Sequence, residues 1–273
     1  MSPATFEVTP HFAYWDCYWG ELHRDGDPRF PTIIYGFDSV APENARRSRE
    51  VAIPAVGACY GYVESGEVAV RAAEGPGRDL TVSREMFFST ANGAVLRFTA
   101  PGRVVVVQAV GYRGFNLGGG PIEERGRLRY IDTCSDTVLV ASPLLGDPCL
   151  NHLHFPEGVD QTEHTHPSTR AGMIARGSGW CMTPSGRYAL SPGRIFHIPR
   201  DGRHRFATEA GSMDVIAYHP DSDFGPTHEE HPMVNRTWVD GRKIDNTAGR
   251  HVQARMVPGR GGVEVPDAYR PGR

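Results

Sequence analysis

The chain has 273 residues, and its 29 Lys and Arg residues nearly balance its 32 Asp and Glu residues, which gives a formal net charge of −3 and a pI near 6.5. This balance excludes the basic footprint expected of a protein that binds nucleic acid or an anionic membrane surface. No apolar run approaches the roughly 20 residues of a membrane span, the first residues lack a secretory-signal pattern, and the five cysteines form no CxxC pair, so we expect a cytoplasmic protein without a membrane partner.

Short apolar runs rich in β-branched residues recur along the chain and are typical of strands in a β-sandwich or barrel. Plentiful glycine (32) and proline (22) supply the turns between them. Long amphipathic segments with a helical period are missing, and the one possible helix is short, near Pro42–Arg49. The pattern therefore predicts an all-β fold, with strands that include Gly61–Val63, Val68–Arg71, Arg103–Val110, Asp136–Ala141 and Asp214–Tyr218.

A weak internal repeat indicates two similar halves. Residues 60–70 resemble residues 171–181, and residues 80–93 resemble residues 190–202. Both matches have the same offset of about 110 residues, and two blocks at one offset are better evidence than either alone. We therefore predict two similar β-barrels in series.

The boundary between the two halves is predicted at the glycine-rich segment Gly118–Gly126. The N-terminal half then covers residues 1–118 and the C-terminal half residues 119–240. Residues 241–273, rich in Gly, Arg and Pro, are expected to form a loose tail or an arm across a neighbouring subunit. Such an arm favours a homodimer.

Three histidines of the C-terminal half have the spacing of a metal site. His164 and His166 are one residue apart, so on a β-strand they point to the same face, and His204 follows after a turn that contains Pro and Gly. Three imidazoles on one face can bind a first-row transition metal and leave open positions on it, and ligand type alone allows Zn, Ni, Cu, Co or Fe. The corresponding positions of the N-terminal half hold side chains without donor atoms, roughly Ile53, Ala55 and Val95. That half is therefore predicted to be degenerate, without metal ligands.

The histidine pair lies in a pattern that resembles the first motif of the cupins. That motif is a Gly, five residues, His-x-His and a second Gly further on. Gly158, His164, His166 and Gly177 have these spacings. His-x-His alone is common, but the full spacing is not.

The second cupin motif has a Pro five residues before its metal-binding His, as Pro199 precedes His204 here. The resemblance covers residues 137–218 well and residues 50–110 weakly, so the whole chain resembles a bicupin. The resemblance implies two jelly-roll barrels, also called double-stranded β-helices, of which the second carries the metal.

Arg170 occupies the position at which many cupins have a glutamate ligand, and a guanidinium cannot ligate a cation. The ligand set then resembles that of three-histidine cupins, among them thiol dioxygenases and diketone dioxygenases, and this resemblance implies Fe(II). A cation beside the metal predicts an anionic substrate group that the guanidinium binds through two hydrogen bonds. In the alternative interpretation, Arg170 turns outward or pairs with an acid such as Glu163. A carboxylate of Glu163, Asp160 or Glu157 is the alternative metal ligand.

Further side chains are candidates for the pocket around the metal. His197 is a candidate acid/base group or fourth ligand, if it points inward. His154, which forms a same-face pair with His152, is a candidate substrate-binding residue, as are Trp180 and Tyr218. The competing interpretation is that these are strand histidines satisfied by backbone or water, and ordinary core aromatics.

These features favour a non-haem Fe(II) oxygenase that oxidises a small, anionic metabolite with O2. One alternative is a metal-dependent isomerase or lyase that acts without O2, and another is a non-enzymatic bicupin that binds a metal or ligand. A fold supports many functions, so the resemblance does not choose among them. The sequence has no glycine-rich phosphate loop or dinucleotide fingerprint, so no nucleotide cofactor is expected.

Overall fold

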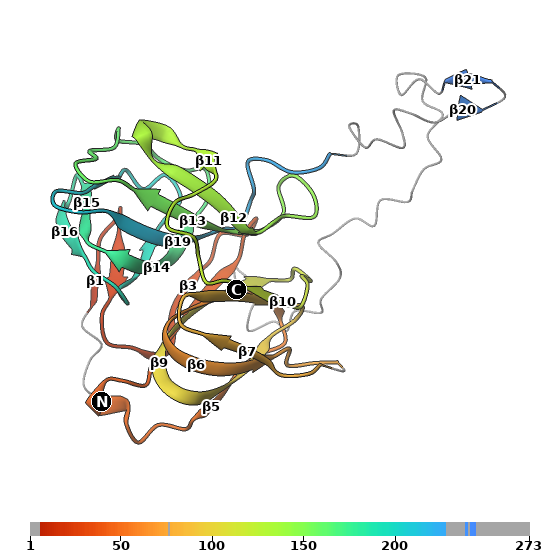
Figure 1. Cartoon of the computed structure of the whole chain (residues 1–273), viewed down its shortest axis with the longest axis horizontal. Coiled ribbons are helices and arrows are strands. Elements are labelled where there is room, and N and C mark those ends of the chain that lie inside the picture. Colours follow the sequence, from red (N-terminus) through yellow and green to blue (C-terminus); the bar gives the residue numbers. More distant parts are fainter. Residues whose placement is uncertain (1–5, 76, 228–237, 240, 244–273) are drawn as a thin grey trace.

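The structure, a computed structural model, describes residues 6–75, 77–227, 238–239 and 241–243 (Figure 1). Nearly all of the predicted tail at 241–273 lies outside these residues. No helix in the described part has the length and apolarity that crossing a membrane requires.

The described residues confirm the predicted all-β fold. Helix is limited to two 3-10 turns, η1 (Pro42–Asn44) and η2 (Ile131–Thr133). The helix suggested near Pro42–Arg49 shortens to η1, whose N-terminus has no side-chain cap and whose one buried residue is Asn44. A single turn without an apolar face cannot be stabilised by packing, so the helix does not extend.

An eight-stranded antiparallel sheet forms the frame of the second half, with the order β1-β2-β17-β14-β19-β13-β12-β11. A three-stranded sheet, β16-β15-β18, shares an apolar core with it. The bounds of these strands are β1 (Phe6–Val8), β2 (Ala13–Trp15), β11 (Leu128–Arg129), β12 (Ser135–Val140), β13 (Cys149–Phe155), β14 (Arg170–Gly177), β15 (Gly179–Thr183), β16 (Gly186–Leu190), β17 (Ile195–Ile198), β18 (Arg205–Ala207) and β19 (Met213–His219).

A second antiparallel sheet forms the first half, with the order β10-β8-β6-β9-β4-β3, to which β5 and β7 add through β9 and β6. A short hairpin, β20–β21, belongs to neither sheet. The bounds of these strands are β3 (Trp19–Asp25), β4 (Thr32–Asp38), β5 (Glu50–Ile53), β6 (Gly57–Arg71), β7 (Leu80–Ser83), β8 (Met86–Thr90), β9 (Ala94–Val110), β10 (Leu117–Gly119), β20 (Trp238–Val239) and β21 (Arg242–Lys243).

The N-terminal strands depart from the predicted division at residue 118. β2 pairs with β17, with Trp15 opposite Ile195, and β1 pairs with β2, so β1 lies beside the strands of the second half (Figure 1). The Tyr18 hydroxyl adds a buried hydrogen bond of 2.6 Å to the Gly193 carbonyl. The prediction of a first half that contains all of residues 1–118 is therefore wrong at its beginning. The edge of β17 would otherwise present unpaired N–H and C=O groups, which β2 satisfies.

Both faces of the central strands β17, β14, β19 and β13 are buried. One face packs against the first half, where Met173 shares a core cluster with Tyr62 and Val105. The opposite face shares a separate core with the three-stranded sheet, and Ile174 and Phe206 belong to it. Successive residues of one strand therefore point either to the contact between the halves or into the second barrel.

Gly66 and Gly177 have equivalent positions in the two halves of the repeat and the same conformation. Their φ angles are 76° and 67°, and a Cβ atom at either would overlap a backbone carbonyl of the facing chain, at Pro101 and Ser212 respectively. Gly158 has a similar φ of 75° but open space around it. Gly177 is therefore required both for its backbone conformation and for the close approach of the facing chain.

We predict that Gly177→Ala destabilises the fold more than Gly158→Ala. Both variants have an alanine in the left-handed region, which costs roughly 1–2 kcal/mol. Only Gly177→Ala adds an overlap with a fixed backbone atom, which costs about 1–3 kcal/mol more. The free energy of unfolding in urea measures both losses, and equal losses would contradict the importance of the close approach.

Candidate metal centre

His164 and His166 lie in the segment between β13 and β14, and His204 lies just before β18. The pair was predicted on a regular strand, but only an isolated antiparallel bridge joins His164 to His204. The two residues exchange backbone hydrogen bonds of 3.0 and 3.1 Å. This bridge is enough to hold the local backbone extended, so His164 and His166 still project to one side as the spacing predicted.

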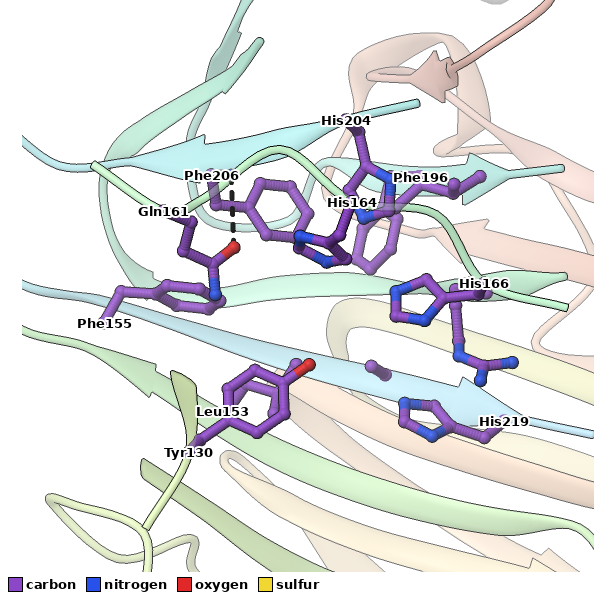
Figure 2. Close-up of a pocket in the computed structure, with 13 residues that line it drawn as sticks. Tyr130, Leu153, Phe155, Gln161, His164, His166, Phe196, His204, Phe206 and His219 are labelled. Carbon is purple, nitrogen blue, oxygen red and sulfur yellow. Dashed lines mark hydrogen bonds between the residues drawn. The ribbon is translucent and has the colours of Figure 1, made fainter. Parts of the chain in front are cut away.

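The three imidazole rings converge. Their centroids are 4.6 Å apart for His164 and His204, 5.0 Å for His164 and His166, and 5.2 Å for His166 and His204. One nitrogen from each ring lies within 4.8 Å of the others. Figure 2 shows the rings turned toward one another at one end of the pocket. The three side chains could therefore hold one metal ion, as predicted.

Backbone carbonyls orient two of the three rings. Nδ1 of His164 donates to the Thr162 carbonyl at 2.8 Å, and Nδ1 of His204 donates to the Gly202 carbonyl at 2.8 Å. Because a carbonyl can only accept, Nδ1 carries the proton and Nε2 keeps its lone pair in the neutral ring. This is the arrangement that prepares an imidazole to ligate a metal through Nε2.

The surroundings favour the neutral form of His166 and His204. Burial lowers the pKa of His166 to about 2, assisted by the Arg170 guanidinium and the neighbouring histidines. Burial also lowers the pKa of His204 to about 4, although its hydrogen bond to Gly202 opposes the shift. Neutral imidazoles are the form that binds metals, so a proton does not compete for these nitrogens near neutral pH.

Arg170 points into the second barrel and is 3% exposed. Its Nη1 donates to the Thr169 carbonyl (2.9 Å), to the Ser168 hydroxyl (2.5 Å) and to the Asp221 carboxylate (3.2 Å). Its Nε has no hydrogen-bond partner among the described residues. Arg170 therefore does not turn outward or pair with Glu163, but it does pair with an acid, Asp221, as the alternative interpretation allowed.

None of the three acidic residues predicted as alternative ligands belongs to the histidine group. Glu163 pairs with Arg203 at 2.5 Å, and Asp160 pairs with Arg205. Glu157 is exposed. Among the described residues, the group that could hold a metal contains three histidines and no carboxylate.

The pocket that the three rings face is small. Its cavity volume is about 20 Å³, enough for one ion or one water molecule. Most of its wall is apolar or aromatic, and the lining residues other than the three histidines and Arg170 are Tyr130, Leu153, Phe155, Gln161, Phe196, Ile198, Phe206, Ala217 and His219.

His197 does not line this pocket, which corrects its predicted catalytic role. The pocket takes Phe196 and Ile198 from β17, so His197 between them points to the other face. There its Nε2 lies 2.7 Å from the Thr169 hydroxyl and 3.5 Å from the Asp25 carboxylate.

His154 and Tyr218 also lie on the strand faces that point away from the pocket. His154 and His152 both contact one carboxylate oxygen of Asp214, at 2.8 and 2.9 Å, while the residues that flank His154 line the pocket. Tyr218 packs on Tyr60 of the first half, with ring centroids 5.3 Å apart. The prediction that His154 and Tyr218 bind substrate is therefore wrong, because both point to the contact between the halves.

Trp180 does not reach the pocket either, so its predicted substrate-binding role is wrong. Its ring is covered by the Arg187 guanidinium, 3.6 Å from the ring centroid. Trp180 and Arg187 belong to the hairpin of β15 and β16, and Cys181, the next residue, points into the core.

Three polar pocket residues were not predicted: Tyr130, Gln161 and His219. His219 ends β19 with its ring centroid 6.5 Å from that of His166, and Figure 2 shows both rings at the same end of the pocket. His219 follows the buried Val215 and Ala217 at intervals of two residues, so alternation along the strand could have placed it on the same face. Tyr130 lies in an irregular connection, where no periodicity is available.

Comparisons with known proteins agree with the fold. A family model described as the AraC-like ligand binding domain matches residues 148–225, and a search of curated proteins found no match. Similar solved structures include a cupin 2 conserved barrel domain protein from Leptotrichia buccalis (14% identity, 73% of this chain and 88% of that chain, TM-score 0.52). A putative glyoxylate induced protein from Pseudomonas aeruginosa (13%, 82% and 93%, 0.52) and AerE from Microcystis aeruginosa (12%, 78% and 93%, 0.51) are further examples. At these identities the likeness shows the cupin fold alone.

The surroundings of His197 lead to a prediction about Asp25. Burial by itself would raise the pKa of Asp25, but hydrogen bonds from His197 and from the Asp27 backbone lower it from 3.8 to about 2. The ionised carboxylate therefore stabilises the fold above about pH 4, and this stabilisation is lost as the pH falls toward 2. Asp25→Asn should lower the free energy of unfolding by about 2 kcal/mol at neutral pH and by progressively less below pH 4. Denaturant unfolding at a series of pH values measures the difference, and a difference independent of pH would contradict this account.

Proposed function

We propose that this protein is a metal-dependent cupin oxygenase in which His164, His166 and His204 hold Fe(II) and which oxidises a small, anionic metabolite with O2. The observation that carries the proposal is the convergence of three imidazoles, one nitrogen of each within 4.8 Å of the others, at a small pocket without a carboxylate ligand among the described residues. Zn, Ni, Cu and Co fit the same donors. The resemblance to three-histidine cupins makes Fe(II) the first choice.

The side chains around the three histidines would bind and orient the substrate. A ferrous ion held there would supply the electrons for O2 activation. Arg170 is buried beside the histidines with a free Nε, so it would bind the anionic group of the substrate and fix its orientation. The phenylalanines of the wall, Phe155, Phe196 and Phe206, would exclude water from the reacting groups.

In this proposal the chain is a bicupin whose first barrel is structural. Its interior is a closed apolar cluster that includes Ile53, Leu96 and Phe88, and the positions equivalent to the metal ligands hold no donor atoms. The first barrel would support the second through the shared core formed by Tyr62 and Met173.

A second candidate function is ligand binding without catalysis. The match of residues 148–225 to the AraC-like ligand binding domain favours it, because that description names binding and no reaction. The same pocket, with Arg170 as its anion-binding residue, would then report the presence of a small anion.

We predict that His166→Ala loses bound metal and keeps its fold, because the all-β core does not contain the ligand. Metal content after loading with Fe(II) under nitrogen measures the first effect, and far-UV circular dichroism the second. His197→Gln is the matched control, since His197 is also buried but points away from the site, and it should retain metal. Equal metal contents in wild type and His166→Ala would contradict the ligand assignment.

The reaction class is tested by oxygen uptake. Wild-type protein loaded with Fe(II) should consume O2 when the right member of a panel of small carboxylic acids is added, and His166→Ala should not. Turnover of an acid under nitrogen would instead indicate isomerase or lyase chemistry. Binding of an acid without turnover under either atmosphere would support the ligand-binding function.

A further inference from the structure

The connection between β11 and β12 brings Tyr130 to the pocket. Tyr130 lines the cavity that the three histidines face, and Figure 2 shows its hydroxyl directed into that space. The residues on either side of it, Arg129 and Ile131, are exposed. Tyr130 is therefore the residue through which the connection between β11 and β12 enters the site.

The Tyr130 hydroxyl is available to a ligand. It makes no hydrogen bond to any described residue, whereas Gln161 beside it accepts from the Phe206 N–H (3.2 Å) and donates to the Cys134 thiol (3.8 Å). Burial and the nearby Asp136 raise the pKa of Tyr130, although Arg170 opposes this, so the hydroxyl keeps its proton. A protonated, unpaired hydroxyl that faces a pocket is a hydrogen-bond donor for whatever enters.

The backbone next to Tyr130 is strained. Asp132 and Thr133 are both in the left-handed region, with φ angles of 52° and 67°. This conformation is rare for non-glycine residues and a genuine outlier for a β-branched one such as Thr133. Strain of this kind persists only where the surrounding structure enforces it, and it concentrates at functional sites.

Hydrogen bonds from the metal-binding segment hold the strained turn in place. The Asp132 carboxylate accepts from the Thr162 N–H at 2.8 Å and from the Thr162 hydroxyl at 3.3 Å. The carbonyl of the same Thr162 accepts from Nδ1 of His164. One residue thus positions both a proposed metal ligand and the turn that carries Tyr130.

The cavity is small, so a ligand bound there would contact the residues of its wall. A volume of about 20 Å³ leaves little space beside a metal ion, which favours a small ligand. Strands β13, β14, β17 and β19 supply most of the wall and are paired on both sides within the sheet. Tyr130 instead enters the wall from the turn between β11 and β12, which Thr162 holds in place through Asp132.

We propose that Tyr130 is a substrate-contacting residue, whose hydroxyl donates a hydrogen bond to the anionic group of a metal-bound ligand, and that Asp132 is its positioning residue. This inference rests on the proposed metal centre. It assigns to the turn between β11 and β12 a part in ligand recognition, in addition to that of the Arg170 guanidinium.

The test uses the full chain loaded with Co(II), whose visible absorption reports ligands at the metal, and acetate as the anionic probe. Tyr130→Phe should bind Co(II) as the wild type does, while its dissociation constant for acetate rises about tenfold, the loss expected for a hydrogen bond to a charged group. Tyr188→Phe is the matched control, because it removes a tyrosine hydroxyl from the same barrel outside the pocket, and its acetate affinity should be unchanged.

A double-mutant cycle separates positioning from general support of the fold. If Asp132 acts through Tyr130, Asp132→Ala should weaken acetate binding in the wild type and have no further effect in Tyr130→Phe. Equal acetate affinities in wild type and Tyr130→Phe would overturn the inference, and additive losses in the cycle would overturn the role of Asp132. A wild-type protein that binds no Co(II) would contradict the metal centre itself, which is a different result from unchanged acetate binding in a Co(II)-loaded variant.

Discussion

The candidate metal centre depends on one constraint, that the central sheet of the second half is buried on both faces. Because side chains alternate along a strand, each of β13, β14, β17 and β19 contributes one set of residues to the contact between the halves and the other set to the pocket. The segment that carries His164 and His166 is then held against this frame by its bridge to His204. A shift of one residue in the pairing of any of these strands would exchange pocket residues for residues of the contact between the halves.

The buried charge of Arg170 connects the architecture to the chemistry. A guanidinium that is 3% exposed is costly unless it is paired, and Asp221 with two neighbouring oxygens meets only part of its hydrogen-bonding capacity. The same charge helps keep His166 neutral, so it favours metal binding by that ring while it would repel the ion itself. An anion between the two cations would relieve this conflict, and the anionic substrate is proposed for this reason.

The sequence was sufficient for the fold class and for the three convergent histidines, but not for the rest of the pocket. The spacing of His164 and His166 is a local property that does not require knowledge of strand orientation, and His204 was added because its segment resembles the second cupin motif. His197, His154 and Tyr218 lie on strands whose two faces are both buried, so no alternation of polar and apolar residues shows which face meets the pocket. All three were therefore assigned to the wrong side, and the pocket residue His219, next to Tyr218, was missed.

Other features depend on contacts between distant parts of the chain. Tyr130 and Asp221 lie in irregular connections, where composition predicts a turn and no direction for the side chain. The N-terminal strands pair with β17, and neither their length nor their composition distinguishes them from a strand of the first half. Burial and pairing at long sequence separation decide these positions, and a single sequence does not contain them.

The place of β2 beside β17 also affects how the protein is made. During synthesis β2 leaves the ribosome before nearly all other strands, but its partner emerges only after most of the chain has been translated. Until then its apolar residues, among them Trp15, lack the neighbours that they have in the folded protein and can associate with other chains. The second barrel therefore cannot be completed co-translationally by its own half, and release of an isolated C-terminal fragment would leave β17 as an open edge to which another molecule could add.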